Sequence, residues 1–290
     1  MIGISSSSYY YKPKISPEER AKQDTDLRDK IEQIHVELPG YGYRRIREHL
    51  KREGINVNWK KIRRVMREYG LLPEIKRAYV TTTDSKHGFT IFPNLVKGLM
   101  LTGLNQVWVS DITYIRIATC FVYLAVVIDL YSRKVVGWAI AKGLGRELAL
   151  GALRMALENR RPPEGCIHHS DRGVQYACHE YVELLKENEL QVSMAAKGNP
   201  YENPVAESFM KTLKREEVYL WNYETYTEVI ERLPYFIEEV YNKKRLHSSL
   251  GYLPPDEFEK LTMEKITCLP EGVATTACKP LLNSENNLSS

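Results

Sequence analysis

The stretch QVWVSDITYIRIATCFVYLAVVIDLYSRKVVGWAIA, residues 106–141, decides the fold class. It holds three runs rich in β-branched and aromatic residues, at 107–115, 121–129 and 134–141, and turn-forming residues separate them. Such runs at hairpin spacing predict three strands that follow one another in a sheet.

Helical and extended patterns alternate after this stretch. The expected elements are a helix at about 145–159, a strand at 166–171, a helix near 176–188, a strand at 191–195 and a helix at 204–217. Strands that alternate with helices, behind a run of hairpins, predict an α/β domain with a mixed sheet. A long helical stretch at 223–245 follows, and Pro234 inside it predicts a kink or a break.

The N-terminal third of the chain is basic. Residues 1–100 hold 20 Lys and Arg against 12 Asp and Glu, which gives +8, whereas the rest of the chain sums to −4. Short helices are expected at 16–38, 41–54 and 58–70, capped at their starts by residues such as Ser16 and Asn58. With tight glycine turns and a cationic last helix, they fit a helix-turn-helix DNA-binding domain, and the alternative is a small helical bundle with a solvated basic face. The cationic residues expected to contact DNA are Arg44, Arg45, Lys60, Lys61, Arg63, Arg64 and Arg67.

The bulk composition excludes several classes of protein. The content of 43% hydrophobic and 27% charged residues is that of a soluble globular protein, and no apolar run approaches the roughly 18 residues of a membrane span. We therefore expect a cytoplasmic protein. The five cysteines form no CxxC pair, which argues against a zinc site and a disulfide framework. The predicted domains are a helix-turn-helix-like domain at 1–72, a linker at 73–105, a catalytic core with a C-terminal helix at 106–262 and a flexible tail at 263–290.

Three carboxylates stand at informative places in this pattern. Asp111 lies within the first expected strand, Asp171 ends the fourth, and Glu207 lies in the first turns of the helix that begins at about 204. Strand ends and a helix that covers one sheet face can converge on one point, and three oxygen donors there suit Mg²⁺ or Mn²⁺. Two such ions serve phosphoryl transfer. The spacing alone is weak evidence for a metal site, because 37 acidic residues allow many sets of three and most acidic side chains are solvated.

A family resemblance strengthens this interpretation. QVWVSDITYI, VIDLYSRKVVGW, HHSDRGVQY, GNPYENPVAESFMKTLKRE and YNKKRLHSSLGYLPP resemble, in this order, the transposases of the insertion-sequence-three family, which look like retroviral integrase cores. The resemblance runs from about Tyr41 to Phe258, and 35 residues separate Asp171 from Glu207, as in the DD(35)E signature. It implies a ribonuclease-H-like fold, a five-stranded mixed sheet with helices on both sides. It also implies that Asp111, Asp171 and Glu207 are catalytic and hold two Mg²⁺ ions, with Mn²⁺ as a substitute.

The family resemblance gives weaker indications for the roles of several other residues. Lys211 and Lys214 share the helical face of Glu207, and the resemblance implies that they hold the DNA end; solvated lysines are the alternative. Asn203 precedes the helix and is expected either to cap it or to support the site from behind. His169, like its neighbour His168, is interpreted as a strand histidine beside the site. The remaining motif residues are Asp129, interpreted as structural, and Arg245 and His247, which have no assigned role.

The resemblance implies the catalytic part of a DNA transposase. Such an enzyme cuts at the ends of its mobile element, and the exposed 3′-hydroxyl attacks another phosphodiester, first joining one element end to the other as a circular intermediate. The implied partners are terminal inverted repeats, target DNA and further copies of the chain, in the nucleoid of a bacterium. The start MIGISSSSYYYKP looks like a downstream reading-frame product, so an upstream-frame helix-turn-helix and leucine-zipper protein, fused or separate, is a further expected partner. The rivals are a DNA-binding regulator or inhibitor without catalysis and a metal-dependent nuclease that only hydrolyses.

Overall fold

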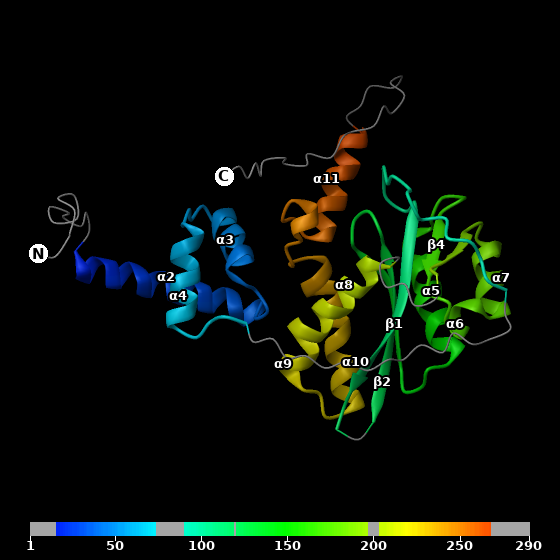
Figure 1. The fold of residues 1–290 in the computed structure, drawn as a ribbon, viewed down its shortest axis with the longest axis horizontal. Coiled ribbons are helices and arrows are strands. Elements are labelled where there is room, and N and C mark those ends of the chain that lie inside the picture. The colour runs from blue at the N-terminus through cyan, green and yellow to red at the C-terminus, as the bar shows by residue number, and fades with distance from the viewer. Residues whose placement is uncertain (1–15, 74–89, 119, 197–202, 268–290) are drawn as a thin grey trace, which may run out of the picture. The chain divides into compact units, whose positions relative to one another are not determined.

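A computed structural model describes residues 16–73, 90–118, 120–196 and 203–267 of the chain (Figure 1). The chain divides into two compact units, Met1–Lys76 and Arg77–Ser290, and each is described by itself. Within the described residues, every helix is too short or too polar to cross a lipid bilayer.

Within residues 16–73, the first unit contains three helices. They are α2 (Pro17–Glu37), α3 (Tyr43–Arg52) and α4 (Trp59–Glu68). The two predicted caps are confirmed, because Ser16 Oγ accepts from the Glu19 amide at 3.0 Å and Asn58 Oδ1 accepts from the Lys60 amide at 2.9 Å. Gly54 ends the turn after α3 at a φ of 81°, in the left-handed region that favours glycine. The fully buried side chains of this unit include Ile31, Ile46, Leu50, Ile62, Val65 and Met66.

The second unit is organised around a mixed five-stranded sheet. The strands are β1 (Val107–Arg116), β2 (Phe121–Asp129), β3 (Val135–Ala141), β4 (Ile167–Ser170) and β5 (Gln191–Met194). Their order is β3-β2-β1-β4-β5, with antiparallel hairpins from β1 to β3 and parallel pairing of β1 with β4 and of β4 with β5. The predicted hairpins and the mixed sheet are thus confirmed.

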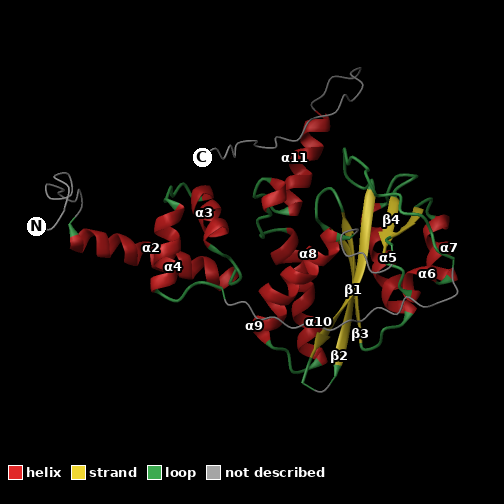
Figure 2. Ribbon diagram, in the orientation of Figure 1, coloured by secondary structure: helices red, strands yellow, loops and turns green. Residues whose placement is uncertain are grey.

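Helices cover both faces of this sheet (Figures 1 and 2). One face packs on α5 (Arg146–Arg160), α6 (Val174–Ala177) and α7 (His179–Glu187), through a core that includes Trp108, Val127, Leu153 and Tyr181. The opposite core joins Val109, Leu124 and Val126 to Phe209, Leu213 and Phe236. The elements on that side are α8 (Pro204–Leu213), the π-helical η2 (Lys214–Val218), α9 (Tyr219–Trp221), α10 (Tyr226–Tyr235) and the π-helical η3 (Phe236–Asn242). This is the ribonuclease-H-like arrangement that the motifs imply.

Several elements differ from the prediction. The helix expected at 176–188 is two short helices, because the backbone at Cys178 is extended. Pro234 does not break α10, which continues to Tyr235; the irregularity instead follows as the π-helical η3, a common response to strain in a helix. After the 3₁₀ turn η4 (Ser248–Leu250), helix α11 spans Pro255–Thr267. The first five residues of the tail that was predicted to be flexible from 263 are therefore helical, and the rest lies outside the described residues.

The described part of the predicted linker lies against the core unit. Phe92 packs on one core, and Val96 and Leu101 pack on the other. The Leu95 amide donates to Ser193 Oγ on β5 at 2.9 Å. Residues 90–105 therefore pack as part of the second unit, although they contain no helix or strand.

Candidate active site

Asp111 and Asp171 are brought together by the register of two parallel strands. Val107 of β1 pairs with Ile167 of β4, and the pairing continues to Val109 and His169. Two residues further along, the same register sets Asp111 level with Asp171. Alternation along β1 directs the Asp111 carboxylate to the face of Val109, which is the face covered by α8, and Asp171 follows directly after the end of β4.

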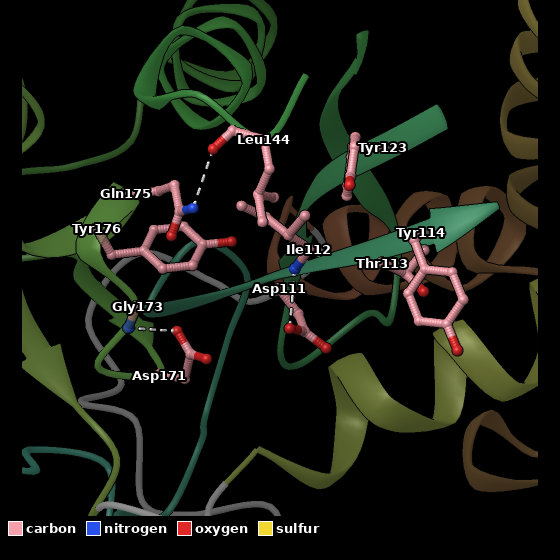
Figure 3. Close-up of a pocket in the computed structure, with 10 residues that line it drawn as sticks. All are labelled: Asp111, Ile112, Thr113, Tyr114, Tyr123, Leu144, Asp171, Gly173, Gln175 and Tyr176. Carbon is pink, nitrogen blue, oxygen red and sulfur yellow. Dashed lines mark hydrogen bonds between the residues drawn. The ribbon is translucent and has the colours of Figure 1, made fainter. Parts of the chain in front are cut away.

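Local hydrogen bonds orient the two carboxylates. Asp111 Oδ1 accepts from the Ile112 amide at 2.8 Å, and Asp171 Oδ1 accepts from the Gly173 amide, also at 2.8 Å (Figure 3). A Cβ at position 173 would lie 2.9 Å from Asp171 Oδ1, closer than side-chain atoms tolerate. Glycine at this position therefore leaves room for the carboxylate turn that follows β4.

The two aspartates interact unfavourably in the absence of a cation. Burial is the largest cause that raises the pKa of Asp111 to about 7, and the charge of Asp171 raises it further. The charge of Glu207 acts in the same direction, whereas the Ile112 amide and Lys214 act against it. A cation beside the pair would remove this repulsion, which is the electrostatic character of a carboxylate metal site.

Glu207 lies near this pair but makes a different contact. It lies in the first turn of α8, and its Oε2 accepts from Lys211 Nζ at 3.0 Å, one helical turn further on. Within the residues that the structure describes, no group of three or more His, Cys, Asp or Glu side chains is arranged to hold a metal ion. The structure thus places Asp111 and Asp171 together and leaves Glu207 beside them, paired with Lys211.

The two lysines of α8 and η2 have different surroundings. Lys211 is exposed, whereas Lys214 is half-buried, and its Nζ lies 4.3 Å from the centre of the Tyr114 ring. Burial lowers the pKa of Lys214, and the carboxylate of Asp111 opposes that shift. Lys214 is therefore held beside the carboxylate pair by a cation–π contact.

Asn203 does not cap α8 with its side chain, which removes one of its two expected roles. Its Nδ2 instead donates to the carbonyl oxygen of Ser110 at 3.1 Å, so it ties the start of α8 to the residue before Asp111. The other expected role, support of the site from behind, is consistent with this contact.

The two strand histidines are buried beside the site. His168 Nε2 contacts Ser110 Oγ at 2.7 Å and the Tyr181 hydroxyl at 2.9 Å, and burial lowers its pKa to about 3, so the ring is neutral. His169 Nδ1 contacts Ser193 Oγ at 2.8 Å. Both rings take part in bonds that join strands and helices, as expected for strand histidines.

Arg245, which had no assigned role, and Asp129, which was interpreted as structural, both make contacts that stabilise the fold. Arg245 forms a bidentate pair with buried Glu216 at 2.7 and 2.9 Å, and also lies 3.3 Å from Thr212 Oγ1 and 3.4 Å from the His247 ring. The segment after η3 is thereby anchored to α8, which carries Glu207, and to η2, which carries Lys214. Asp129 accepts from three backbone amides, those of Asn105, Tyr131 and Ser132, at 2.6 to 2.9 Å. It stabilises the turn after β2.

Sequence reasoning did not identify Tyr176 as a residue of the site. Tyr176 lines a small pocket together with Asp111, Asp171, Gly173 and Gln175, and its hydroxyl points toward β1 at Asp111 (Figure 3). The available signal was its place in HHSDRGVQY, five residues after Asp171.

The seven cationic residues predicted to contact DNA have different surroundings. Lys61 and Arg64 contact buried Asp24 of α2, at 3.3 and 2.8 Å, so they join α2 to α4. Arg45 is partly buried and lies over the ring of Tyr41. The others are exposed, and three of them surround the stacked rings of Tyr43 and Trp59, whose centres are 5.8 Å apart. The exposed set is Arg44, Lys60, Arg63 and Arg67.

Comparison with known proteins agrees with this geometry. The integrase core domain model matches residues 102–200, a second integrase core domain model matches 188–255, and an HTH-like domain model matches 22–79. The fold and these matches define a polynucleotidyl transferase of the DDE transposase and integrase class.

The relatives identify the family within this class. The 31 kDa protein of insertion element IS600 from Shigella sonnei is 37% identical over 90% of this chain and 96% of its own length. The transposase InsF for insertion sequence IS3A from Escherichia coli K12 is 37% identical over 76% of each chain. The chain belongs to the insertion-sequence transposases of the IS3 family. Among solved structures, the catalytic core domain of BIV integrase is 21% identical over 56% of this chain and 99% of its own, with a TM-score of 0.41, too low to bear on this assignment.

Proposed function

We propose that this transposase cuts and joins DNA strands at the ends of its insertion sequence, with Asp111, Asp171 and Glu207 as the catalytic carboxylates. The proposal is supported by the parallel register of β1 and β4, which brings Asp111 level with Asp171 at the end of β4. Two like charges held so close are unfavourable in a fold unless a cation joins them. Glu207 is the third ligand, and it leaves Lys211 when metal and DNA are bound.

The donor set fits two Mg²⁺ ions, with Mn²⁺ as a substitute, because carboxylate oxygens are the ligands that these ions prefer. When bound, such ions activate the attacking oxygen and stabilise the leaving oxygen of a phosphodiester. The chain's own residues do the remaining work. Asp111 and Asp171 hold their carboxylates toward one point, and Lys214, fixed on Tyr114, offers its ammonium to a DNA phosphate beside them. Lys211, once released from Glu207, offers a second.

Each of the two units has its own proposed DNA partner. The exposed cations Arg44, Lys60, Arg63 and Arg67 of the helical unit bind the terminal inverted repeat, because phosphate contacts supply most of the affinity for duplex DNA. The core acts on the element end and then on target DNA, and one end joined to the other is the first product. At least two copies of the chain hold the two ends. The upstream-frame helix-turn-helix and leucine-zipper protein, fused or separate, is a further partner, and the assembly works on the nucleoid in the bacterial cytoplasm.

The test uses a duplex of the element end with a free 3′-hydroxyl, incubated with the protein and Mg²⁺. We expect joined strands from the wild type and none from Asp171→Asn. Nicked strands without joined products would favour a nuclease that only hydrolyses. Sequence-specific binding without either product, with or without the upstream-frame partner, would favour a DNA-binding regulator.

A further inference from the structure

Tyr176 is held rigidly at the edge of the carboxylate pocket. It lies on the short helix α6, five residues after Asp171, and only 3% of its surface is exposed. Its ring packs edge-on against Tyr181, with ring centres 5.4 Å apart and an interplanar angle of 80°, and it also contacts the ring of His168. The position of its hydroxyl is therefore set by the packing of the ring.

The hydroxyl groups of these two neighbouring tyrosines differ in one respect. The Tyr181 hydroxyl contacts His168 Nε2 at 2.9 Å. The Tyr176 hydroxyl is buried, and none of the residues that the structure describes forms a hydrogen bond with it. A buried polar group without a partner destabilises a fold, so native structures rarely keep one unless a water, an ion or a ligand completes it.

The direction of the Tyr176 hydroxyl indicates where that partner lies. Tyr176 lines the same pocket as Asp111 and Asp171, and Figure 3 shows its hydroxyl end directed across the pocket toward β1 at Asp111 and Ile112. Burial, the neighbouring Tyr181 and, to a smaller extent, the charges of Asp111 and Asp171 hold the pKa of Tyr176 well above its usual range. A phenol is protonated at neutral pH even without such a shift, so the hydroxyl can donate a hydrogen bond into the pocket that Asp111 and Asp171 line.

We propose that Tyr176 is a positioning residue of the cutting and joining reaction, whose hydroxyl donates a hydrogen bond to an oxygen atom bound between Asp111 and Asp171. This inference rests on the proposed role of that pair. The oxygen belongs either to a water that enters with the metal or to the DNA. In both cases the hydroxyl fixes the orientation of the oxygen without exchanging a proton with it. A phenylalanine would fill the same space, so the hydroxyl has no packing role.

The test compares Tyr176→Phe with Tyr181→Phe, which removes a hydroxyl from the adjacent ring. In metal-free protein we expect Tyr176→Phe to unfold at the same temperature as the wild type or higher, because an unpartnered buried hydroxyl is lost. We expect Tyr181→Phe to unfold at a lower temperature, because the contact with His168 is lost, and to bind Mn²⁺ as the wild type does.

Two further measurements distinguish the source of the oxygen. If it is a water that enters with the metal, Tyr176→Phe weakens Mn²⁺ binding in the absence of DNA by about three- to tenfold, the usual effect of one hydrogen bond. If it belongs to DNA, Mn²⁺ affinity is unchanged and the rate of joining at saturating metal falls by a similar factor.

The proposal is overturned if Tyr176→Phe matches the wild type in both Mn²⁺ affinity and joining rate. It is also overturned if Tyr176→Phe loses thermal stability in metal-free protein as Tyr181→Phe does, because the hydroxyl is then structural. Asp171→Asn is measured in parallel. An active Asp171→Asn protein would overturn the proposed catalytic carboxylates themselves, whatever the tyrosine variants do.

Discussion

The register of the parallel strands β1 and β4, continued by two residues, sets Asp111 level with Asp171, the residue directly after β4, although 59 residues separate them in the sequence. Neighbouring strands are about 4.8 Å apart, so the register alone brings two like charges close together. Repulsion between these two carboxylates destabilises the folded, metal-free protein. The pair is therefore better explained as a binding site for a cation than as a stabilising contact.

Neutralising Asp111 should stabilise the metal-free protein. The pKa of Asp111 is about 7 in the fold and about 3.9 in an unfolded chain, so between these values the folded state binds more protons. Stability then falls as pH rises from 4 to 7. Asp111→Asn removes this loss, so we expect its melting temperature to exceed that of the wild type above pH 7 and the difference to shrink toward pH 5.

Thermal unfolding across this pH range checks the prediction, with Asp26→Asn on the exposed side of α2 as the control that leaves the profile unchanged. Mg²⁺ at pH 8 should stabilise the wild type and not Asp111→Asn, because only a bound ligand shifts unfolding. An equal response of both proteins to Mg²⁺ would contradict the prediction.

Arg64, which contacts buried Asp24, and the exposed Arg63 should respond differently to mutation. Arg64→Ala leaves buried Asp24 with Lys61 alone, so we expect a loss of about 1–3 kcal/mol in stability. Arg63→Ala removes an exposed cation, so stability stays within about 0.5 kcal/mol and DNA affinity falls. The slope of log affinity against log salt should fall by about 0.9 for that variant. Denaturant unfolding and salt-dependent binding of an element-end duplex distinguish the two variants. A stable Arg64→Ala protein with weakened DNA binding, together with an unstable Arg63→Ala protein that binds DNA normally, would contradict the prediction.

Breaking the buried Glu216–Arg245 pair should strongly destabilise the core unit. Arg245→Met leaves the Glu216 carboxylate buried without its bidentate partner, so we expect a loss of about 3–5 kcal/mol in the free energy of unfolding. Replacing both residues by Met should be much less harmful than the single change, because no unpaired charge remains. A double-mutant cycle by urea unfolding measures this coupling. Additive single and double effects would show that the pair is unimportant.

Gly137 of β3 should tolerate no side chain. An added Cβ would lie 2.6 Å from the Ala156 amide nitrogen and against the Ala152 carbonyl oxygen, and both belong to the backbone of α5. Since neither can move independently, we expect Gly137→Ala to lower stability by about 1–3 kcal/mol or more. Gly143→Ala is the control, because nothing lies within 4 Å of its added Cβ. The urea unfolding midpoints of the two variants check the prediction. An unchanged midpoint for Gly137→Ala would show that α5 packs less closely on β3 than the structure indicates.

The strands of the sheet could be predicted because they are determined by residues close together in the sequence. The hairpin strands at 107–115 and 121–129 match β1 and β2 within one residue, since β-branched runs and turn residues determine them. The alternation of strands and helices predicted a mixed sheet, and the structure shows which strands pair in parallel: β1 with β4, which brings Asp111 close to Asp171. The match of the HTH-like domain model to residues 22–79 likewise bears out the helix-turn-helix interpretation of the N-terminal unit.

What the sequence did not predict depends on contacts between distant residues. The π-helical η2 buries Glu216 against Arg245, 29 positions away, and no local pattern indicates that pair. Lys61 and Arg64 were predicted to bind DNA because the sequence of their own helix gives no sign of their partner, the buried Asp24 on α2. The contact of Glu207 with Lys211, by contrast, was foreseeable, because residues four apart on a helix lie side by side.

The most direct test of the central claim replaces Asp171 by cysteine. A thiolate binds Mg²⁺ poorly and softer ions better, so a metal ligand at this position can be recognised by the metal that restores activity. We predict that Asp171→Cys joins no element ends in Mg²⁺ and regains joining in Mn²⁺, while the wild type is active in both. Joining by Asp171→Cys in Mg²⁺ at the wild-type rate would contradict the account, because Asp171 would then not hold the metal.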